Sequence, residues 1–482
     1  MSTAEANLNT AHAAAHVGRG AAILAAATLF CKAGSLAVVP FILRAFSREA
    51  YGEYSAAFAY AGLLGMVAYF GMNPIVTRDI ARGEKPRGWV ILHCTALRLI
   101  LLVVAAGALT FVGIAKGFTA GMWALAWLAF AAMSFDAVTG AVKAAMQAEG
   151  RFARMALVEM VRKASQWVLA ILVIVLGANI VMLAGGVALA AAAAFAAALA
   201  MGMSRNDLAD MGLAPSYAMK MLRLAAPMGL SAAFVLALKQ VNIWMLDILR
   251  GPVDVATYQA GVLFKPDFLA QSVVWAILPL AFKLARDDRS QLADAIRAAS
   301  RYLGIGGWAL AMIFFCGGAT FVPLLAGGQY RESIWVFRLL GLSLPFAFVS
   351  LLYLHALTAV DKQVIAAVIF AVGLLTNFAI DVALVPRLGA SGAIIGTLAT
   401  EILIAAASFA AVWKTVGRPF GSLDGKALAA ILAGIAVAAL SSAVNLPDMG
   451  ILGVAALVSV LFFLKVVSRK DVAFVQAVLG AK

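Results

Sequence analysis

Long apolar runs that recur at short intervals constrain the fold of this chain more than any other feature. Hydrophobic residues make up 64% of the 482 residues and charged residues only 12%, and the mean hydropathy is +0.98. A soluble domain is nearer half apolar and a quarter charged, so charge this sparse could not cover a water-exposed surface. The chain is therefore predicted to be an all-α polytopic membrane protein. The same composition excludes a disordered chain and a disulfide scaffold.

Fourteen membrane spans are expected, because a helix needs about 20 apolar residues to cross a bilayer. Bounded by Pro, Gly and charged residues, they cover residues 21–43, 53–72, 89–113, 120–142, 157–177, 180–202, 224–249, 257–281, 303–326, 333–358, 363–385, 391–413, 426–444 and 449–467. The connections between them are short. They leave no room for a soluble catalytic domain.

The basic residues are distributed unevenly over these connections. The chain has 37 Lys and Arg against 23 Asp and Glu, a net charge of +14. Most of the 37 lie in the termini and the even-numbered connections, a group that includes Arg162 and Lys163 near the start of the 157–177 span. The odd-numbered connections hold only Arg44, Arg48, Lys116, Arg250, Arg331 and Arg387. By the positive-inside rule, both termini and the basic connections are predicted to be cytoplasmic. The basic excess then reflects topology and anionic lipid headgroups, and no nucleic-acid partner is expected.

Two parts of the chain about 205 residues apart resemble each other, since ILRAFSREAYGEYSAA from Ile42 is echoed by ILRGPVDVATYQAG from Ile248. The alignment pairs Arg44 with Arg250, Tyr54 with Tyr258, Pro74 with Pro279 and Arg78 with Lys283. Each repeat has six helices, so both enter from the cytoplasm and the pseudo-axis runs along the membrane normal. The expected parts are a cytoplasmic N-terminus (1–20), an N-lobe (21–203), a cytoplasmic connection (204–223), a C-lobe (224–415), two further helices (416–467) and a cytoplasmic tail (468–482).

Motifs for catalysis or metal binding do not stand out in the chain. Its three Cys lie inside expected spans and its four His are scattered, without the spacing of metal ligands or disulfides. Neither a phosphate-binding Gly-rich loop nor a nucleophile elbow is present. We therefore expect no enzyme activity, no cofactor and no metal, and a protein that moves a substance across or within the bilayer.

Apart from those counted with the connections, five basic residues fall inside the expected spans. A charge at the bilayer centre costs about 2.5–3.5 kcal/mol on an insertion scale, so each must face protein, water or an anion. The repeat places Lys32 and Lys239 at matching depths on the first and seventh helices, which would flank a cleft between the lobes. Such a cationic cleft is predicted to bind an anion, and Lys is a compact partner for phosphate. These candidate binding residues are Lys32, Lys239, Lys265, Arg338 and Arg98.

Other interpretations of these cations stay open. Each could pair with an acid on a neighbouring helix or lose its proton on burial, and Arg338 could reach the periplasmic interface. Asp267 and Glu401 are candidates for ion coupling, or for neutralising a lysine. Gln240 and Asn242 could hydrogen-bond sugar hydroxyls or join helices. Asp136 lies within a span, and Asp381 lies near a periplasmic helix end, where hydration is expected.

Several motifs give the chain a family resemblance over residues 17–415. They are ILRAFSREAYGEY, FGMNPIVTRDIARG, APMGLSAAF, VATYQAG, ILPLAFK, LLAGGQYRES and NFAIDVALVPRLGASGAIIGTLATE. In them the chain resembles the polysaccharide transport and O-antigen (Wzx-type) flippases of the multidrug/oligosaccharidyl-lipid/polysaccharide (MOP) exporter superfamily. The chain departs from this family at Asn242, where the family often has an acid.

The resemblance implies two pseudo-symmetric six-helix lobes followed by two helices. It implies alternating-access transport of a polyprenyl-diphosphate-linked oligosaccharide across the bacterial cytoplasmic membrane, for O-antigen, capsule or exopolysaccharide. Membrane lipids, a polysaccharide polymerase and glycosyltransferases are the partners it suggests, and we expect a monomer. The alternatives are a multidrug or metabolite exporter, a peptidoglycan-precursor flippase and a non-transporting scaffold for glycan-assembly enzymes.

Overall fold

Helices make up the regular structure of this protein throughout its described residues. The structure is a computed structural model that describes residues 23, 26–204, 207, 212 and 214–419. The chain divides into two compact units at the bond between Gln240 and Val241. This bond lies inside a long helix, so one helix contributes to both units.

The first unit begins with a helix over Ala26–Ala45, called the first helix below. The helices that follow are α2 (Arg48–Tyr69), α3 (Met72–Arg82), α4 (Arg87–Lys116), α5 (Ala120–Ala148), α6 (Phe152–Val175), α7 (Ile180–Gly202) and α8 (Pro215–Leu249), which passes into the second unit. Short polar side chains begin several of them. Ser47, Thr119 and Asn179 each accept a hydrogen bond from a backbone N–H in the first turn of the helix that follows.

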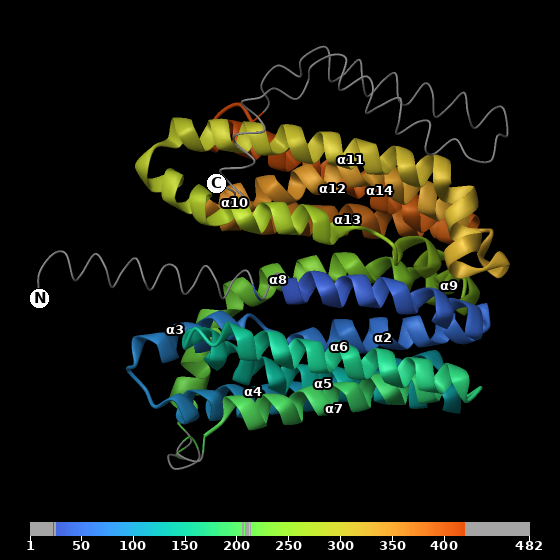
Figure 1. Ribbon diagram of the computed structural model, residues 1–482, viewed down its shortest axis with the longest axis horizontal. Coiled ribbons are helices and arrows are strands. Elements are labelled where there is room, and N and C mark those ends of the chain that lie inside the picture. Colours follow the sequence, from blue (N-terminus) through green and yellow to red (C-terminus); the bar gives the residue numbers. More distant parts are fainter. Residues whose placement is uncertain (1–22, 24–25, 205–206, 208–211, 213, 420–482) are drawn as a thin grey trace, which may run out of the picture. The chain divides into compact units, whose positions relative to one another are not determined.

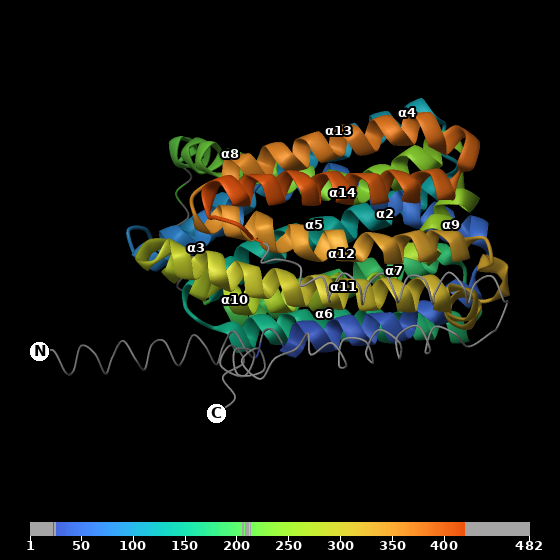
Figure 2. The same cartoon turned by 90° about the horizontal axis from the view of Figure 1, so that it is seen from above.

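The second unit contains α9 (Pro252–Val262), α10 (Asp267–Asp287), α11 (Arg289–Ala326), the 3-10 turn η2 (Gly328–Tyr330), α12 (Ser333–Ala359), α13 (Gln363–Leu388) and α14 (Ala390–Thr415). Within it, α11, α12, α14 and α13 lie next to one another in that order (Figure 2). Helix α12 is the central element, because it packs against α9, α10, α11 and α14. Its Val336, Leu344 and Leu357 are fully buried.

The predicted all-α membrane architecture is confirmed. The first twelve predicted spans coincide with described helices, whereas the spans at 426–444 and 449–467 lie outside the described residues. Among the described helices, 10 are long and apolar enough to cross a membrane, or up to 11 if a bent pair within α10 counts as one. Helix α6 is not among them, because Glu159, Arg162 and Lys163 fall within its apolar run.

Surface and core have the polarity expected of a protein in lipid. Large apolar side chains such as Val103, Phe111 and Val175 are more than 70% exposed on the outside of the helices. Small residues are frequent in the interior of the first unit. Along α7, Ala190, Ala191 and Ala194 are buried, and this lets α5 and α6 both pack closely on α7 (Figure 1).

The second predicted span of each repeat is interrupted. In the first unit, α2 ends at Tyr69 and α3 begins at Met72. Gly71 lies between the two helices and has a φ of +65°. A Cβ at Gly71 would overlap the backbone of Gly229 in α8, so glycine is required here for both reasons. In the second unit, the break lies between α9 and α10 at residues 263–266. Each of these two predicted spans is therefore divided into two helices.

Candidate functional site: a charged pocket in the first unit

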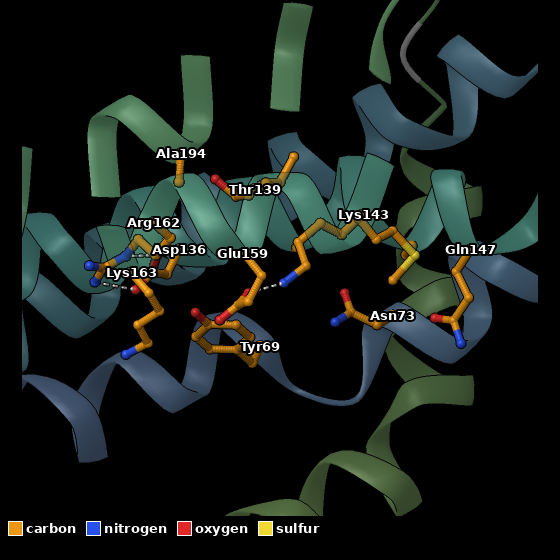
Figure 3. Close-up of a pocket in the computed structure, with 14 residues that line it drawn as sticks. Tyr69, Asn73, Asp136, Thr139, Lys143, Gln147, Glu159, Arg162, Lys163 and Ala194 are labelled. Carbon is orange, nitrogen blue, oxygen red and sulfur yellow. Dashed lines mark hydrogen bonds and ion pairs between the residues drawn. The ribbon is translucent and has the colours of Figure 1, made fainter. Parts of the chain in front are cut away.

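A cavity of about 320 Å³ lies within the helices of the first unit (Figure 3). Residues from α2, α3, α5, α6 and α7 line it. They are Tyr69, Asn73, Asp136, Thr139, Gly140, Lys143, Ala144, Gln147, Met155, Val158, Glu159, Arg162, Lys163 and Ala194. Five of them are charged: Lys143, Arg162 and Lys163 are basic, and Asp136 and Glu159 are acidic.

Helical periodicity explains why these side chains meet. On α5, Lys143 follows Asp136 by seven residues and Gln147 follows Lys143 by four, so the three side chains share one helix face. On α6, Glu159 and Arg162 are three residues apart and also share a face. Helices α5 and α6 both pack on α7 but touch each other little. The two charged faces therefore meet across the cavity, which Ala194 of α7 also lines.

Two ion pairs cross the pocket from α6 to α5. Arg162 makes a bidentate contact with Asp136, from Nε to Oδ1 at 2.9 Å and from Nη2 to Oδ2 at 3.1 Å. Lys143 Nζ donates to Glu159 Oε2 at 2.8 Å. The Arg162 side chain is 11% exposed, whereas those of Asp136 and Glu159 are 27% and 34% exposed. The guanidinium is thus fixed in the wall and both carboxylates are accessible from the cavity (Figure 3).

Lys163 is the surplus cation of the pocket. Within the described residues it forms no ion pair, and its ammonium is 3.4 Å from Gln166 Oε1. Lys32 of the first helix is near enough to Lys163 for the two charges to repel each other. The first helix is held there by Trp167, one turn further along α6, which contacts Phe30 and donates to Ser35 Oγ. Three cations and two carboxylates give this pocket a net charge of about +1 when all are ionised.

Arg98 of α4 is fully buried beside the pocket. Its Nη1 donates to the carbonyl of Ala137 and its Nη2 to Asn73 Oδ1 at 2.5 Å. No carboxylate within the described residues pairs with it. Gly140 makes room for the guanidinium, since a Cβ there would lie 3.0 Å from Nη1. Arg98 therefore holds the side-chain amide of Asn73 at the pocket wall.

The remaining predicted binding residues of the first unit lie on α8. Lys239 is exposed and Gln240 is half-buried, with its side-chain amide close to Gly62 of α2. The five predicted cations are divided between the two units. Lys32 and Arg98 lie near the charged pocket, and Lys265 and Arg338 belong to the second unit.

In the second unit, Lys265 pairs with both predicted acids. Its ammonium is 3.2 Å from Glu401 Oε1 and 3.4 Å from Asp267 Oδ1. This is the neutralising arrangement that the sequence leaves open as an alternative. Arg338 contacts aromatic rings, with its guanidinium 5.4 Å from the centre of Trp335 and 5.7 Å from that of Phe315.

Asn242 joins three helices of the second unit. Its Nδ2 donates to Tyr258 Oη at 2.7 Å and to Thr397 Oγ1 at 2.8 Å, and its side chain is buried. Asp381 of α13 is also fully buried, contrary to the hydration that its place near a helix end suggests. Neither of its carboxylate oxygens has a hydrogen-bond partner within the described residues.

Sequence reasoning missed most of the pocket. A search for apolar runs assigns Lys143, Arg162 and Lys163 to a cytoplasmic connection. Glu159 is not identified by that search. One signal was available in the sequence. Arg162 and Lys163 follow Glu159 by three and four residues, so the three charges give the apolar run a polar helix face. Which helix this face meets depends on the packing of α5 and α6 against α7, and the sequence does not specify that packing directly.

The fold is similar to those of solved MOP superfamily transporters. The lipid II flippase MurJ in an inward closed conformation is similar, with a TM-score of 0.74 and 12% identity over 93% of this chain and 99% of MurJ. An inward-facing multidrug resistance MATE transporter matches with a TM-score of 0.59, at 16% identity over 80% and 94% of the two chains. A MOP superfamily transporter from Pyrococcus furiosus matches with a TM-score of 0.56, at 17% identity over 84% and 96%. No curated protein sequence matches the chain.

Residues 17–283, more than half of the chain, match the polysaccharide biosynthesis protein family. The chain belongs to this family. The family resemblance inferred from the sequence motifs is thereby confirmed, and the protein is a multi-pass membrane protein whose fold is similar to that of MurJ.

Proposed function

We propose that this protein moves a polyprenyl-diphosphate-linked oligosaccharide from the cytoplasmic to the outer leaflet of the bacterial cytoplasmic membrane. The product would serve a surface polysaccharide such as O-antigen, capsule or exopolysaccharide. The observation that carries the proposal is the charged pocket, whose cations outnumber its acids, inside a helical membrane protein of the polysaccharide biosynthesis family.

The chemistry of the pocket suits such a substrate. Charged groups within apolar helices are expensive to retain, so a polar ligand is a strong reason to keep them. Arginine and lysine are the side chains that bind phosphate oxygens, and Arg162 and Lys163 offer both kinds of donor. The amides of Asn73 and Gln147 and the ring of Tyr69 suit sugar hydroxyls and the apolar face of a sugar ring.

The sequence-derived cations belong to the same proposal. Lys32, Lys239, Lys265, Arg338 and Arg98 would accompany the diphosphate along its path, with Gln240 and Asn242 as polar contacts. Asp267 and Glu401 would serve ion coupling. Transport would proceed by alternating access, and an ion gradient or the membrane potential would supply the energy, about 2.3 kcal/mol per charge across 100 mV.

The cellular setting follows from the charge distribution. Both termini would be cytoplasmic by the positive-inside rule. The protein would act as a monomer, as a transporter without enzyme activity or cofactor, and would receive its substrate from glycosyltransferases and pass it to a polymerase.

A peptidoglycan-precursor flippase is the second candidate, because the fold matches the lipid II flippase MurJ over nearly its whole length. Two strains distinguish the candidates, one depending on this gene for surface glycan and one depleted of its own lipid II flippase. Expression of this chain should restore glycan to the first and should not restore growth to the second. The reverse outcome would establish the second candidate.

The proposed cationic path is tested by Lys32→Ala and Lys239→Ala in the first strain. Export of the glycan should fall while the membrane level of each variant stays normal. Undiminished export by both variants would contradict a role for these lysines. Raised tolerance of overexpressing cells to cationic dyes, without any change in glycan, would favour a drug exporter instead.

A further inference from the structure

Each carboxylate of the pocket forms an ion pair with one of its basic side chains. The carboxylate of Asp136 binds the guanidinium of Arg162, and that of Glu159 binds the ammonium of Lys143. The fork of a guanidinium binds two phosphate oxygens in the same bidentate manner as two carboxylate oxygens. The two carboxylates thus sit where phosphate oxygens would sit.

We propose that Asp136 and Glu159 are counter-anions that the diphosphate of the substrate displaces from Arg162 and Lys143. This inference rests on the proposed function and names the phosphate subsite within it. When the pocket is empty, the two acids would offset two of its three positive charges. An uncharged or cationic ligand could not replace them, so the exchange would select for anionic lipid headgroups.

The burial of the groups fits such an exchange. The Arg162 side chain is the most buried of the four, and its Nη1 also donates to Gln166 Oε1 at 3.3 Å. It is therefore held in place when Asp136 turns away. The two carboxylates are the more exposed partners in their pairs. They can move into the open cavity while the cations stay on the helix faces.

Lys163 provides the place where an anion would bind first. Having no acid partner in the described structure, it attracts an anion without any displacement. Lys32 adds a second positive charge on the same side. A diphosphate bound there lies next to Arg162, the neighbouring residue on α6, and can then compete with Asp136. Cost and gain are both modest, because both ion pairs are partly exposed and such pairs contribute little free energy.

Binding of inorganic pyrophosphate to the purified full-length protein in lipid nanodiscs tests the inference by calorimetry. Glu159→Gln and Asp136→Asn should each bind it more tightly, by roughly two- to fivefold, because they remove the competitor at constant shape. Lys163→Gln should bind it more weakly by a comparable factor. Asp294→Asn is the matched control, since it removes an exposed acid from the second unit and should leave affinity unchanged.

Unchanged or weaker pyrophosphate binding by Glu159→Gln would overturn the inference, as would wild-type protein that binds no pyrophosphate. If Asp136→Asn fails to fold, Glu159→Gln alone tests the inference. Its partner Lys143 is more exposed than Arg162, so loss of the Glu159 charge should disturb folding less. Glycan export in the dependent strain separates the two claims. Export that depends on the protein while Glu159→Gln binds pyrophosphate no more tightly would retain the proposed function and reject the displacement.

Discussion

At the scale of single residues, Arg98 shows how a charge is accommodated inside a membrane helix bundle. Its guanidinium is fully buried and its partners are one carbonyl and the amide oxygen of Asn73. Neutral acceptors satisfy part of the guanidinium, and its Nε has no hydrogen-bond partner among the described residues. Such a residue connects α3, α4 and α5 more than it supplies charge to the cavity.

Arg98→Ala should lower the free energy of unfolding by about 1–3 kcal/mol, because the Ala137 carbonyl and the Asn73 side chain lose their hydrogen bonds to the guanidinium. Arg98→Lys should retain part of this energy, since one ammonium can reach one acceptor. The thermal unfolding midpoint in detergent measures both effects. Equal midpoints for the wild-type protein and Arg98→Ala would show that Arg98 does not hold these helices together.

Asn242 makes a second residue-scale prediction, because both of its hydrogen bonds are to side chains of other helices. Asn242→Leu should destabilise the protein by about 1–3 kcal/mol, since Tyr258 and Thr397 each lose a buried partner. Tyr258→Phe is the informative comparison, because it removes one partner and leaves the Thr397 contact. A larger loss of thermal stability in Tyr258→Phe than in Asn242→Leu would contradict this network.

At the scale of helices, the spans could be predicted and the pocket could not. Runs of about 20 apolar residues are local, so the sequence locates α4, α7 and α12 closely. Lys143 and Glu159 meet only because α5 and α6 share α7 as a packing partner, which is a long-range property. Lys32 and Arg98 are candidates from the sequence because their charges fall inside spans, and for Lys32 also because of the repeat; both lie near the pocket, and their role stays a prediction.

Packing of the first helix on α6 yields a prediction of its own. A Cβ on Gly34 would overlap the indole of Trp167, whereas a Cβ on Gly107 of α4 would meet nothing within 4 Å. Gly34→Val should therefore reduce thermal stability and membrane level, and Gly107→Val should change both far less. Both variants add the same side chain to a helix, so intrinsic helix propensity cancels. Equal losses would show that the first helix does not depend on this contact.

At the scale of the whole molecule, the predicted orientation can be tested with two matched glycines. Gly83 ends α3 and Gly117 ends α4, both with φ of +66° and with nothing within 4 Å of a Cβ. In a chain without native cysteines, Gly117→Cys should react with an impermeant maleimide in intact spheroplasts. Gly83→Cys should react only after permeabilisation. Labelling of Gly83→Cys alone in intact spheroplasts would reverse the orientation.

The central claim is that the charged pocket serves the passage of a diphosphate-linked glycan through the membrane. Vesicles reconstituted with the purified protein and a fluorescent polyprenyl-diphosphate oligosaccharide test it most directly, with an impermeant glycosidase outside to reveal flipped glycan. The wild-type protein and Asp294→Asn should make internal glycan accessible, and Arg162→Ala with Lys163→Ala should abolish most of this activity. Equal accessibility with the double variant would contradict the account.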